Sequence, residues 1–78
     1  MSKLQEVKDL VEQGKTKLIA GKVQEALDEG NKAEDILQSM IDAMGTVGDR
    51  FSAGEIFVPE MLIAAKAMSL GVDVLKPH

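Results

Sequence analysis

The residue types that carry most enzymatic and metal chemistry are nearly absent from this chain. It has no cysteine, and its single histidine, His78, is the last of its 78 residues. Without Cys or an internal His, no serine has a partner to activate it as a nucleophile. Thiolate metal sites and carboxylate-bridged di-metal bundles with E-x-x-H pairs likewise lack their ligands. We therefore predict no catalytic residue and no metal ligand, and we expect the acidic side chains on solvated helix faces.

Apolar recognition is the chemistry that remains, and it centres on the segment "VGDRFSAGEIFVPEM", residues 47–61. Here Phe51 precedes a glycine-containing turn and an apolar triplet follows it. Gly45 and Gly48 stand three residues apart and would let a bulky neighbour approach the backbone. Methionine is adaptable and suits a surface that accepts a flat partner. The same residues also fit an ordinary helix core. The apolar candidates for this surface are Met44, Phe51, Val58, Met61 and Leu62.

Four helices are predicted to position these residues. The first is expected over about Lys3–Gln13 and the second over about Thr16–Glu29. The third begins at Asn31 and ends near Ser52 to Gly54. The fourth begins around Phe57 to Pro59 and is ended by Pro77. Ser2 with Gln5, and Asn31 with Glu34, have the spacing of capping boxes at the first and third helix. Gly14 and Gly30 are placed to end the first two helices.

Apolar residues recur at alternating spacings of three and four along the two longer helices. We expect these stripes to face the core, and we expect Gly71 to weaken the fourth helix. The chain shows no strand pattern. The predicted fold is all-α, a four-helix antiparallel bundle that forms one domain over residues 1–78. The stripes are Ala33, Leu37, Met40, Met44, Val47 and Phe51 in the third helix, and Val58, Met61, Ala65, Met68, Val72 and Leu75 in the fourth.

Composition excludes several classes of partner. The formal net charge is −4, with nine basic residues dispersed among thirteen acidic ones, which is unlike a nucleic-acid surface. No apolar run reaches the roughly 18–20 residues of a membrane span, and the N-terminal segment lacks the apolar core of a signal peptide. We expect a cytoplasmic protein that binds neither nucleic acid nor membrane.

The segment from Met44 to Met68, "MGTVGDRFSAGEIFVPEMLIAAKAM", closely resembles the helical cap module that precedes the cobalamin-binding domain in corrinoid methyltransferase proteins. It also resembles the corresponding modules of cobalamin-dependent methionine synthase and of adenosylcobalamin photoreceptor regulators. The most specific part is G-x-x-F-x-x-G-x-x-F-x-P-E, and the resemblance extends through "LKP" at the end of the chain. It implies a non-enzymatic four-helix bundle that covers the upper face of the corrinoid and shields its cobalt-bound alkyl group.

Carried over residue by residue, the resemblance places the cofactor contacts at Phe51, Val58 and Met61. The methionine synthase module holds a Phe, a Leu and a Val at the matching positions. Leu62 and Met44 join this group by proximity. Glu60, beside them, is either an acid favourable to the helix dipole or a polar contact to the ligand.

Photoreceptor relatives hold a Trp at the position of Phe51 and Glu-His at the positions of Met61 and Leu62. The resemblance therefore favours a methyl carrier of one-carbon metabolism over a cap of an adenosylcobalamin-dependent regulator. The implied partners are a cobalamin-binding α/β domain, a substrate-specific methyltransferase and a second, acceptor methyltransferase. The lower cobalt ligand is expected in a D-x-H-x-x-G motif of that α/β domain. His78 does not match this motif, so we expect the chain to bind cobalamin only together with such a domain.

A different class of function also fits the two regular stripes. The chain could be a stand-alone helical module for protein–protein interaction or oligomerisation. Under either hypothesis a large exposed apolar surface favours association, so we predict some self-association. The methyl donor is left open by the sequence.

Overall fold

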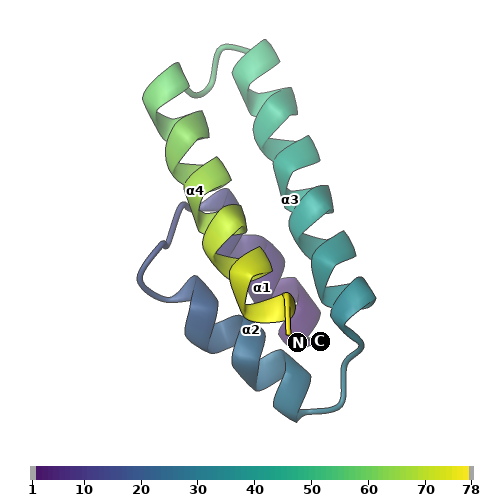
Figure 1. The fold of residues 1–78 in the computed structure, drawn as a ribbon. Helices are drawn as coiled ribbons and strands as arrows, with labels where there is room; N and C mark the ends of the chain where they lie inside the picture. Colours follow the sequence, from purple (N-terminus) through teal and green to yellow (C-terminus); the bar gives the residue numbers. More distant parts are fainter. Residues whose placement is uncertain (1, 78) are drawn as a thin grey trace.

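A computed structural model describes residues 2–77 and consists, over that range, of four helices without strands (Figure 1). The helices are α1 (Lys3–Glu12), α2 (Ile19–Asp28), α3 (Ala33–Ser52) and α4 (Val58–Leu75). Consecutive helices run antiparallel, so the predicted four-helix antiparallel bundle is confirmed. The expectation for His78 concerns a residue outside the described range. Within that range no helix is long and apolar enough to cross a membrane.

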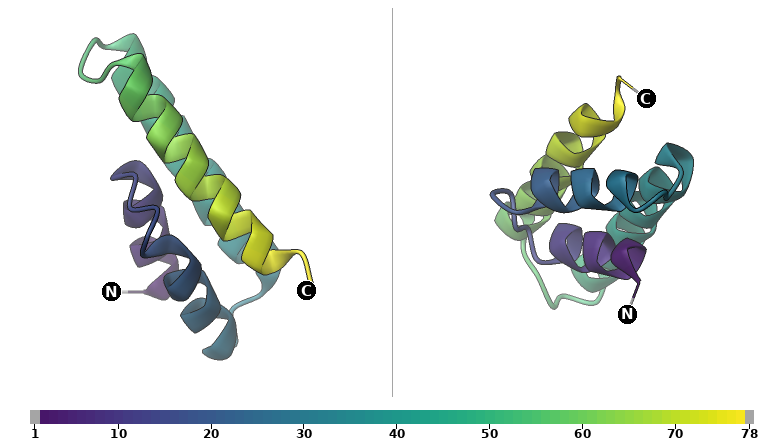
Figure 2. Two further views of the ribbon diagram at one scale, coloured as in Figure 1. Left: turned by 60° about the vertical axis from the view of Figure 1, so that its left-hand side comes forward. Right: turned by 90° about the horizontal axis from the view of Figure 1, so that it is seen from below.

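The helices differ in length, and this difference leaves one end of the bundle uncovered. At about 1.5 Å per residue, α1 and α2, with 10 residues each, are roughly half as long as α3, with 20, and α4, with 18. Figure 1 and the left-hand view of Figure 2 show the α3–α4 hairpin extending well beyond the loop between α1 and α2. We call its projecting end, residues 51–63, the hairpin tip.

The hydrophobic core fills the part of the bundle where all four helices overlap. Its fully buried members on α3 end at Val47, and those on α4 begin at Ala64, which marks where the cover of α1 and α2 stops. The core makes a continuous apolar cluster, and burying its side chains supplies most of the driving force for folding. Its members on the two short helices are Val7, Val11, Ile19, Val23 and Ala26.

The predicted stripes of the two long helices were partly wrong. On α3, Met40 and Val47 are buried as expected, but Ile36 and Ala43 join them and Phe51 is exposed. On α4, Leu75 is buried as expected, but the rest of the inner face is formed by Ala64, Ala67 and Gly71. The predicted Met61, Met68 and Val72 are only half-buried, and Val58 and Ala65 are exposed. The physical reason is that α4 is apolar on almost every side, so its periodicity does not single out one face.

Gly71 is a point of close packing rather than a simple weakness. A β carbon built there would lie 2.5 Å from the Sδ atom of Met40 and 3.3 Å from carbon atoms of Ile19 and Val23. The small residues of α4 therefore let its backbone approach α2 and α3. The expectation that Gly71 merely weakens the helix is corrected accordingly.

Helix ends agree with the sequence where glycine is concerned. Gly14, Gly30 and Gly54 follow the C-caps of α1, α2 and α3 and have φ values of 67°, 94° and 78°, which favour glycine. Before α1, the Ser2 hydroxyl accepts a hydrogen bond from the Gln5 backbone N–H at 3.1 Å.

Three predicted helix starts or caps differ in the structure. The Gln5 side chain donates to Asp9 instead of closing a capping box. The second helix begins at Ile19 and not at Thr16, after a turn. The predicted cap Asn31 precedes the actual N-cap Lys32 of α3 and donates its side-chain N–H to the Ala26 carbonyl at 2.9 Å. Asn31 therefore satisfies the C-terminal end of α2 and not the start of α3.

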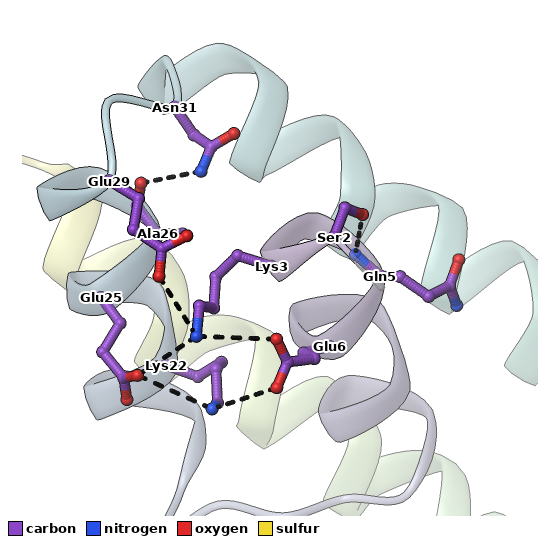
Figure 3. A network of polar contacts seen from close by, with 9 residues as sticks. All are labelled: Ser2, Lys3, Gln5, Glu6, Lys22, Glu25, Ala26, Glu29 and Asn31. Atoms are coloured by element: carbon purple, nitrogen blue, oxygen red, sulfur yellow. Dashed lines mark hydrogen bonds and ion pairs between the residues drawn. The ribbon is translucent and has the colours of Figure 1, made fainter.

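An ion-pair network joins α1 to α2 at the end of the bundle away from the hairpin tip (Figure 3). Lys3 Nζ lies 3.2 Å from a Glu29 carboxylate oxygen and 3.3 Å from one of Glu25, and Lys22 Nζ lies 3.3 Å from one of Glu6. Hydrogen bonds to Glu29 and Glu25 raise the pKa of Lys3. The hydrogen bond from Lys22 lowers the pKa of Glu6. The network thus stabilises the charged forms of Lys3 and Glu6, which both lie on α1.

Candidate functional site

Four of the five predicted site residues lie in the hairpin tip. Phe51 is in the last turn of α3, Val58 is the first residue of α4, and Met61 and Leu62 follow one turn later. The exposed fractions are 39% for Phe51, 51% for Val58 and 63% for Leu62. Met61 is half-buried, as is Met44, which lies about two turns before Phe51 on α3.

The hairpin tip concentrates the exposed apolar side chains of the described residues. Of the seven large hydrophobic residues that are exposed, five belong to it. Phe57, which the sequence analysis left out of its candidate residues, is the most exposed of them at 70%. The apolar triplet of residues 56–58 was the signal that could have identified it. The five are Phe51, Phe57, Val58, Leu62 and Ile63.

Local backbone geometry brings these side chains to one end of the molecule. Gly54 ends α3 with its positive φ, and the Glu55 N–H donates to the Arg50 carbonyl at 2.9 Å. Phe57, with extended backbone, is the N-cap of α4, and Pro59 occupies the first turn, where a missing N–H is harmless. The chain thus reverses within five residues, and both arms of the hairpin present apolar side chains at its end.

Gly48 continues this surface along α3, whereas Gly45 lines a hollow shared with residues of α1. Beyond its chain neighbours and the nearby backbone of α3 itself, a β carbon at either position would meet no atom of the described chain within 4 Å. The predicted close approach is therefore not made by another helix of the bundle. Since residues three and four apart share a helix face, Gly48 lies beside Met44 and Phe51, and exposed backbone surface adjoins the apolar tip.

A charged hollow lies on the side of the hairpin that faces α1. Its volume is about 360 Å³, and it is lined among others by Glu12, Arg50, Glu60 and Ile63. Arg50 Nη2 lies 3.2 Å from Glu12 Oε1. This ion pair joins α3 to α1 within the chain, and the Arg50 side chain is 42% exposed. Glu60 is exposed in the first turn of α4.

Within residues 2–77 there is no group of three or more His, Cys, Asp or Glu side chains that could hold a metal ion. The arrangement at the hairpin tip can instead present an apolar surface that displaces water from a bound partner. Transfer of such surface out of water is favourable by about 25 cal/mol per Å².

Comparison with known proteins gives the chain a family. Residues 3–76 match a family model described as "B12 binding domain". The chain is 44% identical over 67 residues to monomethylamine corrinoid protein 2 of Methanosarcina acetivorans. This alignment covers 81% of this chain and 31% of that protein. A corrinoid protein of Desulfitobacterium hafniense is 33% identical over 79 residues, covering 100% of this chain and 37% of its own length.

A solved structure supports the same relationship. The monomethylamine corrinoid protein of Methanosarcina barkeri superimposes with a TM-score of 0.89 at 34% sequence identity, covering 92% of this chain and 34% of that one. The chain therefore spans about a third of the length of these relatives. By sequence and by structure, the chain belongs to the B12 binding domain family and is a helical cap domain of the corrinoid-protein type.

Proposed function

We propose that this domain covers the upper face of a corrinoid in a methyl-carrier protein and shields the methyl group carried there from water and oxidants. The observation that carries the proposal is the hairpin tip, where exposed apolar side chains gather on a domain of the B12-binding family. When bound, the corrinoid supplies a cobalt ion that takes up a methyl group and gives it away. The domain itself acts as a lid and not as a catalyst.

Three features of the described residues fit a broad, flat and partly apolar ligand. The hairpin tip offers exposed apolar side chains from two helices. Gly45 and Gly48 leave open space beside the α3 backbone. The charged Arg50 is directed toward Glu12 on α1, so it is held on the face that borders α1.

The roles of the individual residues follow from their exposure. Phe51, Val58 and Met61 would contact the ligand face directly, and Leu62 and Met44 would border it. We add Phe57, because it has the largest exposed fraction of the group. All six would bind and orient the ligand and exclude water, and none would transfer a proton.

Tight binding would require a cobalamin-binding α/β domain in the longer protein, since residues 2–77 contain no histidine to serve as the lower ligand. The relatives named for monomethylamine, dimethylamine and trimethylamine make methylamine-specific methyltransferases reasonable donors. We propose that the donor methyltransferase and a second, acceptor methyltransferase are the protein partners, and that the donor enzyme decides the substrate.

The experiment joins the chain to the α/β domain of a relative, loads the fusion with methylcobalamin and measures its rate of aerobic photolysis from the visible spectrum. A lid holds the photolysis products together and keeps oxygen out, so Phe51→Ala should raise the rate several-fold. Leu18→Ala is the matched control, because Leu18 is also a largely exposed apolar residue but lies before α2. Equal rates for Phe51→Ala, Leu18→Ala and the unchanged fusion would contradict the proposal.

A second candidate function is an interaction module that uses the same surface. The exposed apolar residues of the first turns of α4 favour it, since such patches often mark protein interfaces. If the fusion shows no protection of the corrinoid while the chain dimerises with loss of Phe57 exposure, this second function would stand instead.

A further inference from the structure

The hairpin tip projects beyond the rest of the bundle, and the C-terminal end of α1 supplies two contacts near its base. One joins α1 to the last turns of α3, and the other joins the loop after α1 to the first turns of α4. Projecting segments with few buried contacts open locally at low free energy. Contacts at the base of the hairpin therefore decide how firmly its two arms are held relative to each other.

The first contact is the ion pair of Glu12 and Arg50. The Glu12 side chain is only 11% exposed and lies 3.3 Å from Lys8 Nζ and 3.2 Å from Arg50 Nη2. Lys8 contacts the other carboxylate oxygen from within α1, so Glu12 bridges a lysine of its own helix and an arginine of α3. Arg50 immediately precedes Phe51, and fixing its side chain restrains the rotation of the helical turn that carries the ring.

The second contact is made by Gly14. Its φ of +67° already favours glycine, and a β carbon there would lie 2.5 Å from Cγ2 of Ile63 and 3.4 Å from Cβ of Ile63. The Ile63 side chain therefore packs directly against the backbone of the loop at Gly14. Gly30 and Gly54 have similar positive φ values, but a β carbon at either would meet nothing within 4 Å. Gly14 alone of these three combines the backbone requirement with a packing requirement.

We propose that Glu12 and Gly14 are positioning residues for the hairpin tip: Glu12 orients the α3 arm through Arg50, and Gly14 seats the α4 arm through Ile63. They touch no ligand themselves. They set the relative placement of Phe51 on one arm and of Val58, Met61 and Leu62 on the other. The functional importance of this positioning rests on the proposed function. The positioning of the two arms is a property of the chain and can be measured without any ligand.

Amide hydrogen exchange of the 78-residue chain tests the first contact. In Glu12→Gln, exchange of the hydrogen-bonded amides of residues 51–55 should rise roughly two- to fivefold, the range expected for losing one ion pair, while amides of α2 keep their rates. Lys8→Gln is the matched control, since it removes the pair within α1 and leaves Arg50 with its partner. Arg50→Lys keeps the charge and should show a smaller change than Glu12→Gln. A uniform rise in every helix would show only a loss of global stability and would overturn the proposal.

Paired glycine substitutions test the second contact. Gly14→Ala and Gly30→Ala both place alanine at a positive φ, but only the first also meets a side chain. Exchange at the start of α4 should rise at least about fivefold more in Gly14→Ala than in Gly30→Ala, as expected for overpacking. Adding Ile63→Leu, which removes the second γ carbon, should restore part of the protection. Equal effects of the two alanine variants would contradict a seat for Ile63.

Corrinoid protection separates this inference from the proposed function. If both hold, Glu12→Gln and Gly14→Ala raise the photolysis rate of the methylcobalamin-loaded fusion, as Phe51→Ala does. If Phe51→Ala raises it but the positioning variants change neither exchange at the tip nor photolysis, the inference fails and the function stands. If the positioning variants loosen the tip but no variant alters photolysis, the positioning stands and the proposed function fails.

Discussion

Replacing Gly71 by alanine sets two physical effects against each other at one position. In a helix interior the change from glycine to alanine is favourable by about 1 kcal/mol, because glycine loses more backbone freedom on folding. At this position the new methyl group would lie 2.5 Å from Met40 Sδ and 3.3 Å from Ile19 Cγ1 and Val23 Cγ2. Ile19 and Val23 are β-branched and stiff, and all three side chains are fully buried.

The packing effect is expected to exceed the helix effect. An extra methylene in a well-packed core costs about 1–3 kcal/mol, so Gly71→Ala should lower the free energy of unfolding by about 1 kcal/mol net. For a domain of this size that corresponds to a fall in Tm of about 4–8 °C. Gly45→Ala is the control, since Gly45 is also inside a helix but an added β carbon there meets nothing within 4 Å. It should raise the free energy of unfolding by up to about 1 kcal/mol.

Urea unfolding followed by far-UV circular dichroism measures both variants. The double variant Gly71→Ala with Met40→Val relieves one of the three contacts, so its loss of stability should be smaller than the sum of the single losses. If Gly71→Ala is as stable as Gly45→Ala, the close packing of α4 against α2 and α3 would be refuted.

Three further predictions concern other parts of the molecule. The hydrogen bond from Lys22 lowers the pKa of Glu6 from its ordinary value of 4.5. The ionised Glu6 therefore stabilises the fold above pH 4.5, and this stabilisation is lost as the pH falls below that value and the carboxylate is protonated. Acid unfolding curves of Glu6→Gln should accordingly show a weaker pH dependence than those of the unchanged chain. Asn31→Ala removes the hydrogen bond to the Ala26 carbonyl and should lower the free energy of unfolding by about 1 kcal/mol, measured by urea denaturation; unchanged stability would mean that water replaces the amide. Finally, sedimentation over a dilution series should show self-association that Phe57→Ser weakens with little change in Tm, because the ring is exposed; a strict monomer at high concentration would contradict it.

Local signals accounted for the helices and for most of their ends. Glycine at positions 14, 30 and 54 and serine at position 2 act through their own backbone and neighbouring residues, so their effects are visible in sequence. The Asn31–Glu34 spacing was a false signal. It failed because the Asn31 amide has a better partner in the carbonyl of Ala26, five residues before it, and capping patterns do not register that competition.

The candidate site was predicted only in part. Phe51, Val58, Met61, Leu62 and Met44 were chosen from the apolar turn and the family resemblance, and their contact with a ligand stays a prediction. The exposure of the hairpin tip follows from the unequal lengths of the helices, which the sequence pattern suggested.

Local sequence signals specify four helices and an apolar turn, because capping, glycine stops and helical periodicity operate over a few residues. Which face of α4 lies inside depends on the packing of the other helices, because a helix that is apolar all round has no preferred face until its neighbours are present. There the small side chains of Ala64, Ala67 and Gly71 were selected for the interior, since they allow close approach. The larger apolar residues of the hairpin were left at the surface, where they form the proposed lid.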